Sequence, residues 1–116
     1  MSLSLFDTHC DTAFELYRRQ EKLRDNTCHI SLSHADQYEK YVQLFAIWSD
    51  RRLDDQTCWN DFLAIADNFD RLIALENDQI TRIRSTAELE KAIAQSKRAA
   101  VLAESFRSIK KMTPAL

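Results

Sequence analysis

Three segments of the chain have the apolar pattern of β-strands. Near the start, Leu3 and Leu5 alternate with serines, which predicts a strand that is buried early in the fold. The segment 41–48 (YVQLFAIW) is almost continuously apolar and rich in aromatic and β-branched residues, as in a strand covered on both faces. The segment 99–103 (AAVLA) predicts a third strand, and 80–85 reads as a short extended stretch.

Helical patterns separate these strands. A helix of about twelve residues is expected from a cap at Thr12, and a short one from Ser33 to about Lys40. The strongest helix begins at a cap at Asp54 or Asp55 and carries an apolar stripe formed by Trp59, Phe62, Leu63, Ala66, Phe69 and Ile73. Ser85 and Glu88 form a capping box that predicts a helix to about Ser96. Such alternation predicts an α/β fold of parallel strands with right-handed crossovers.

Composition limits the size of the fold and the conformation of its turns. With 116 residues and 45% hydrophobic residues, the chain can form one small domain with a modest core. The chain contains no glycine, so positive-φ turns are expected at Asn26 and Asn77-Asp78. Catalytic loops that approach a ligand closely often need glycine, so its absence argues against a finished active site.

Charge and cysteine content exclude several classes of partner. The formal net charge is −2 and the basic residues form no patch along the sequence, which argues against nucleic acid binding. Cys10, Cys28 and Cys58 contain no Cys-x-x-Cys pair, so we expect a reducing, cytoplasmic location rather than a disulfide framework. No apolar run approaches 20 residues and no signal-like segment occurs, so we expect no membrane association.

The candidate chemistry lies just after the first predicted strand. His9 and Asp11 are two residues apart, so on a strand they would project together while Cys10 faces the other way. An imidazole and a carboxylate can be two ligands of Zn²⁺, but a hydrolytic zinc centre needs at least three protein ligands. The two side chains could equally form a hydrogen-bonded pair without metal. Neither His29 nor His34 has a spacing that completes the set.

Several segments together resemble the start of a known family. FDTHCDTAFEL, HISL, YVQLFAIWSD, the long helix and RSTAELEKAIAQSKRAAVLA resemble the N-terminal part of the membrane (renal) dipeptidase family of zinc metallopeptidases. The resemblance covers residues 3–104, about the first third of a full-length member. It implies parallel β/α units that are the first portion of a TIM-type (β/α)₈ barrel, incomplete here because a whole barrel has about 250 residues. Residues 105–116 would be an irregular or helical tail.

The resemblance also implies a site. The family hydrolyses dipeptides with two zinc ions, and its first-strand His-x-Asp motif corresponds to His9 and Asp11. Its metal-bridging glutamate corresponds to Glu104, although Ser105 stands where the family has glycine. The remaining ligands belong to strands that this sequence does not contain. We therefore expect zinc-dependent dipeptide hydrolysis as the family function, with this chain alone an incomplete and inactive portion.

Two alternatives remain at this point. TatD-type metal-dependent deoxyribonucleases have a similar first strand, but position 11 is Asp here rather than His, and the later segments fit the dipeptidase pattern better. The chain could also be a non-catalytic α/β fragment or interaction domain. In that case we expect self-association through the exposed edges of an unclosed sheet.

Overall fold

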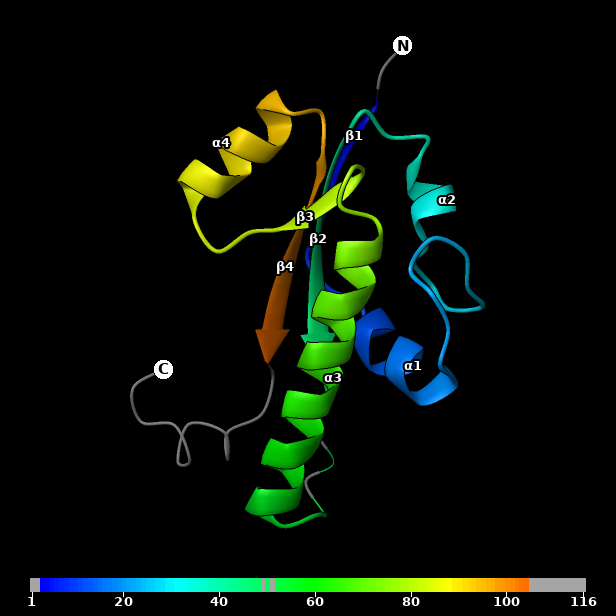
Figure 1. Cartoon of the computed structure of the whole chain (residues 1–116), viewed down its shortest axis with the longest axis vertical. Coiled ribbons are helices and arrows are strands. Elements are labelled where there is room, and N and C mark those ends of the chain that lie inside the picture. Colours follow the sequence, from blue (N-terminus) through cyan, green and yellow to red (C-terminus); the bar gives the residue numbers. More distant parts are fainter. Residues whose placement is uncertain (1–2, 49, 51, 105–116) are drawn as a thin grey trace.

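The computed structural model of the chain describes residues 3–48, 50 and 52–104, and its helices and strands alternate along the sequence (Figure 1). The four strands are β1 (Ser4–Asp7), β2 (Lys40–Ile47), β3 (Ile80–Arg82) and β4 (Arg98–Glu104). The four helices are α1 (Thr12–Arg19), α2 (Leu32–Ala35), α3 (Asp55–Leu75) and α4 (Thr86–Ala94).

The strands form one parallel sheet in the order β1-β2-β4-β3, and every pair of neighbouring strands is parallel. This confirms the α/β fold of parallel β/α units that the alternating pattern predicted. The longest pairing joins β2 to β4, from Val42 opposite Ala99 to Ile47 opposite Glu104. Because the strands are parallel, the carboxyl ends of β1, β2 and β4 lie at one edge of the sheet.

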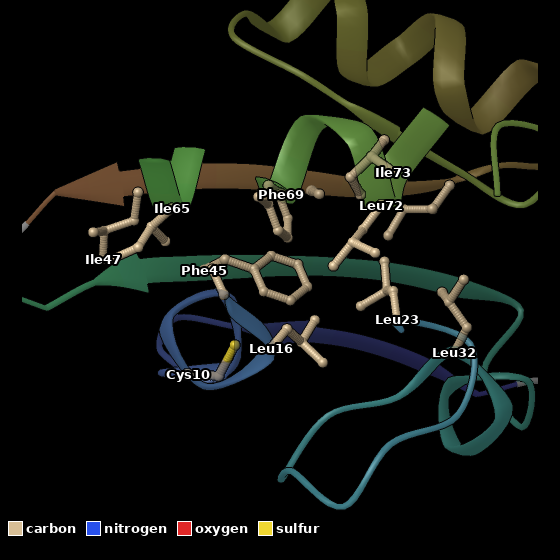
Figure 2. Close-up of a cluster of buried hydrophobic side chains, with 13 residues drawn as sticks. Cys10, Leu16, Leu23, Leu32, Phe45, Ile47, Ile65, Phe69, Leu72 and Ile73 are labelled. Carbon is tan, nitrogen blue, oxygen red and sulfur yellow. The ribbon is translucent and has the colours of Figure 1, made fainter. Parts of the chain in front are cut away.

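The main core lies between the sheet and the helices α1 and α3. Phe45 of β2 contacts Phe69 of α3 with ring centroids 4.7 Å apart, and Leu16 of α1 is fully buried beside them (Figure 2). A second, smaller cluster forms where α4 covers the opposite face of the sheet (Figure 1). Its buried members are Ile83, Ala92 and Ala99. β2 is thus covered on both sides, as its continuous apolar pattern predicted.

The starts of the two clearest predicted helices are confirmed by their caps. Asp54 Oδ1 accepts a hydrogen bond of 2.8 Å from the backbone N–H of Thr57 at the start of α3. Ser85 Oγ accepts one of 3.2 Å from the N–H of Glu88 at the start of α4. Each cap satisfies an amide that would otherwise have no partner in the first turn of its helix.

Two other helices differ from the prediction. α1 starts at Thr12, with Asp11 in the N-cap position, and ends at Arg19 rather than near residue 23. α2 is capped by Ser31, whose hydroxyl accepts from the N–H of His34, and not by Ser33. The segment between them is held by side chains instead, since the Asn26 amide donates to the carbonyls of Lys22 and Ile30.

The prediction of positive φ at Asn26 and Asn77-Asp78 is wrong. Among the described residues, the positive φ angles belong to Gln20 (55°) and Ser96 (58°). Gln20 is the C-cap of α1, and Ser96 follows the C-cap of α4. Helices commonly end with a residue in the left-handed conformation, which is usually glycine. Because this chain has no glycine, another residue type takes the left-handed conformation at these positions. None of the helices in the described part is long and apolar enough to cross a membrane.

Candidate metal site at the carboxyl ends of the strands

The segment after β1 remains attached to β2 beyond the end of the strand. The N–H of Cys10 donates to the carbonyl of Leu44 (3.1 Å), and the N–H of Ala46 donates to the carbonyl of Cys10 (2.8 Å). Cys10 therefore stands opposite Phe45, while Asp7 stands opposite Gln43. Between these two pairs, the segment after β1 has two residues, Thr8 and His9, and β2 has one, Leu44, which is the two-against-one arrangement of a β-bulge.

At the bulge, the side chains of this segment divide into a buried one and two exposed ones. Cys10 is buried in the main core, and burial raises the pKa of its thiol (Figure 2). His9 and Asp11 are exposed, with side-chain exposures of 64% and 56%, and His9 Nε2 lies 3.3 Å from Asp11 Oδ1. The two side chains therefore project together, with Cys10 directed the other way, as the alternation along the sequence predicted.

Asp7 is a further residue of this segment, which the sequence reasoning did not single out. Its Oδ1 accepts a hydrogen bond of 3.1 Å from the backbone N–H of His9. Together with the backbone bonds of Cys10, this bond holds the main chain at His9. The sequence signal for this hydrogen bond was an Asp two residues before His9, because an Asp side chain often accepts from the backbone N–H two residues later.

Glu104 is the last residue of β4, and its backbone is paired with Ile47 of β2. The residue is therefore at the same edge of the sheet as the segment after β1, with β2 between the two. The sequence predicted a strand over 99–103 with Glu104 directly after it, and the structure extends that strand by one residue at each end, to Arg98 and Glu104. The position of its side chain lies outside the described part of the structure.

The donor set at this edge suits a divalent ion but is not complete. His9 offers a ring nitrogen and Asp11 a carboxylate, which are two of the ligand types that zinc prefers. Among the residues whose side chains the structure describes, no group of three or more His, Cys, Asp or Glu could hold a metal ion. His29 lies before α2 and His34 lies within it, and both side chains are exposed.

Asp50, the first described acidic residue after β2, is already paired. Its carboxylate bonds the Arg52 side chain at 2.8 and 3.0 Å, and these bonds lower the pKa of Asp50 to about 2. Near it, a cleft of about 280 Å³ opens between α1 and the start of α3. Trp48 lines the cleft and is 48% exposed, with its ring 5.5 Å from that of Phe14. Asp50 lines the same cleft, so the chain after β2 presents an aromatic and an acidic residue there.

Comparison with known proteins defines the class of fold. No protein-family model and no curated protein sequence matches this chain. Among solved structures, it is similar to a metallopeptidase described as dipeptidase AC of peptidase family M19, with a TM-score of 0.75 and 16% identity. It is equally similar to a metallopeptidase from Rhodobacter sphaeroides, solved with a phosphinate mimic of the dipeptide L-Ala-D-Ala, with a TM-score of 0.75 and 15% identity.

These likenesses cover 90% of this chain but only 36% and 38% of the two neighbours. At such low identity they establish the fold and nothing finer. The chain has the parallel β/α architecture of part of a dipeptidase barrel, and it spans little more than a third of that barrel's chain. In the part of the chain that the structure describes, the four strands form an open sheet and not a closed barrel.

Proposed function

We propose that this chain carries the first part of the zinc site of a dipeptide-hydrolysing metallopeptidase. The observation that carries the proposal is the exposed His9 and Asp11 pair at the carboxyl end of β1, in a fold shared with metallopeptidases. Active sites of (β/α)₈ barrels lie at that end of the strands. His9 and Asp11 would hold one zinc ion. From the family resemblance, Glu104 would bridge it to a second.

Each residue has a separate role in this proposal. Bound zinc would polarise the scissile carbonyl of the dipeptide and lower the pKa of a water molecule. His9 supplies a neutral nitrogen, while Asp11 and Glu104 supply negative charge that partly offsets the two cations. Asp7 is a positioning residue, because it holds the main chain of His9 and touches neither metal nor substrate. These three ligands are too few to close two zinc sites.

The 116-residue chain alone is therefore expected to hydrolyse no dipeptide. In a cell, a cytoplasmic location would fit its three free cysteines. Turnover of a dipeptide by the purified chain, lost in the His9→Ala variant, would contradict the inactivity and would show that these few ligands suffice.

Zinc titration of the purified chain tests the proposed site. We expect one zinc ion to bind, and we expect the Asp11→Ala variant to bind it at least about tenfold more weakly, since a ligand is lost. Asp25→Ala is the matched control, because Asp25 is an exposed aspartate in the loop after α1 and makes no ion pair in the described part of the chain. Equal zinc affinity in the two variants would reject the site.

A second function is favoured by a different observation. Phe6 is 61% exposed on β1, the outer strand of the sheet, and nothing in the described structure pairs with the free edge of that strand. A non-catalytic fragment that persists by association through this edge would show such a surface. It would bind zinc weakly and without dependence on Asp11, so the same titration separates the two proposals.

A further inference from the structure

A groove of about 540 Å³ lies between the edge strand β3 and helix α4. Among the described residues, four basic ones line it, Arg82, Arg84, Lys91 and Lys97, together with one acidic residue, Glu88. These basic residues are spread over sixteen positions and are interrupted by acidic and apolar residues, so they form no basic run in the sequence. The connections from β3 to α4 and from α4 to β4 bring them around one concave surface.

The acidic group of the groove is already used by the fold. Glu88 Oε2 accepts a hydrogen bond of 2.8 Å from the backbone N–H of Arg84, which closes the turn into α4. Arg82 is paired with Asp70 of α3 at 2.7 and 2.9 Å. The side chains of Arg84, Lys91 and Lys97 make no ion pair or hydrogen bond within the described residues. Three cations of the groove are therefore free to meet an anion.

We propose that this groove binds a small, multiply phosphorylated molecule. Several unpaired cations around one concavity favour a ligand with more than one negative charge, because each phosphate can accept charge-assisted hydrogen bonds from Arg and Lys. The volume lies within the range of small-molecule sites, which is roughly 300–1,000 Å³. It is larger than a single inorganic phosphate would fill.

The lining also limits the rest of the ligand. Among the described residues, no aromatic one lines the groove, so a nucleobase would find no ring there on which to stack. Thr81 and Gln95 add neutral polar groups that suit hydroxyl or phosphate oxygens. The ligand class that fits is a polyphosphate or a phosphorylated sugar. Single-stranded nucleic acid, which depends on stacking, fits less well.

The groove is separate from the candidate metal site. Arg82 pairs with Ala100 of β4, and Ala100 is four residues before Glu104, which ends β4 at the carboxyl edge of the sheet. Binding in the groove thus does not rest on the proposed zinc site, and either proposal can fail while the other holds.

Calorimetric titration of the whole chain with tripolyphosphate, without added metal, tests the groove. We expect saturable binding of one molecule, weakening as salt is raised. The Arg84→Gln, Lys91→Gln double variant is expected to bind at least about tenfold more weakly, since two charge-assisted contacts are lost. The control is the Lys22→Gln, Arg71→Gln double variant, which removes one Lys and one Arg with the same change in net charge at exposed positions elsewhere.

Selective loss of binding in the groove variant supports the proposal. Absence of saturable binding, or equal weakening in the control variant, overturns it, because the interaction would then depend only on net charge. Tighter binding of a single-stranded oligonucleotide than of tripolyphosphate at the same phosphate concentration would also overturn it, in favour of a nucleic acid surface.

Discussion

At the residue scale, a local hydrogen bond to Asp7 helps to hold the main chain at His9. Asp7 Oδ1 accepts from the backbone N–H of His9, at the point where two residues of the β1 segment stand opposite Leu44 alone. A bulge of this kind redirects side chains at the end of a strand. The exposed pair of His9 and Asp11 is therefore supported by Asp7 from the main-chain side.

Substitution of Asp7 tests this support. The Asp7→Ala variant loses the acceptor for the His9 N–H, and we expect it to bind zinc about tenfold more weakly. This is the lower end of the loss in metal affinity that follows when a group supporting a metal ligand is removed. The Asp7→Asn variant keeps an oxygen acceptor and should bind nearly as the unchanged chain does. Zinc calorimetry on both variants checks the expectation. Equal weakening by Asn and Ala would mean that Asp7 acts through its charge instead.

The sequence predicted that His9 and Asp11 project together, and they do, although Asp11 is the N-cap of α1 with φ −100° and ψ 14° and is not an extended residue. The sequence could not predict the bulge, which depends on the pairing of Cys10 with β2, a partner more than thirty residues away. Glu104 came from family resemblance alone, and its role as a bridging ligand stays a prediction.

At the element scale, helix starts follow local rules. Asp54 bonds both the backbone N–H and the hydroxyl of Thr57 at 2.8 Å. These bonds hold the pKa of Asp54 below its usual range, the bond to the backbone N–H being the larger cause. A carboxyl with a lowered folded-state pKa stabilises the fold above its unfolded pKa, which is about 3.9 for Asp. That contribution is lost as the pH falls through the folded pKa.

The Asp54→Ala variant should therefore melt below the unchanged chain at neutral pH, by roughly 4–8 °C for a lost cap in a domain of this size. The difference should begin to shrink below the unfolded-state pKa of Asp, about 3.9, and should be lost as the pH falls through the lower pKa that Asp54 has in the folded chain. Thermal melts followed by circular dichroism at several pH values measure it. Asp67→Ala, an exposed aspartate in the middle of the same helix, is the control. A pH-independent difference would contradict the ionic cap.

The buried face of α3 shows where sequence patterns lose accuracy. The predicted stripe included Leu63, which is 42% exposed, and omitted Ile65 and Leu72, which are buried. Phe69 and Ile73 lie in the core as predicted. Over 21 residues, several apolar faces fit the helical period nearly equally well. The choice among them is made by contact with α1 and the sheet, which a local pattern does not contain.

At the scale of the whole molecule, the open sheet is the main consequence of the fold. Phe6 pairs with Val42 and so shares its face of the sheet, but α4 packs against Val42 and leaves Phe6 61% exposed. The unpaired edge of β1 adjoins this side chain. Alternating strands and helices in the sequence predicted parallel β/α units, but a local pattern cannot show what covers an edge.

Self-association through this edge is a prediction for the whole chain. We expect sedimentation velocity to show larger species as the protein concentration rises. The Phe6→Lys variant should shift the population toward monomer, since a charge on an edge strand opposes pairing. Leu75→Lys, at a site on α3 that is 59% exposed, is the matched control and should leave association unchanged. A concentration-independent monomer would count against an adhesive edge.

The most direct test of the central claim is the position of zinc in a crystal of this chain. Anomalous scattering at the zinc edge should place an ion about 2.0–2.2 Å from a ring nitrogen of His9 and from a carboxylate oxygen of Asp11. We also expect the ion to lie at the carboxyl edge of the sheet, the edge at which β4 ends with Glu104. Zinc at other residues, with His9 and Asp11 bonded only to each other, would contradict it.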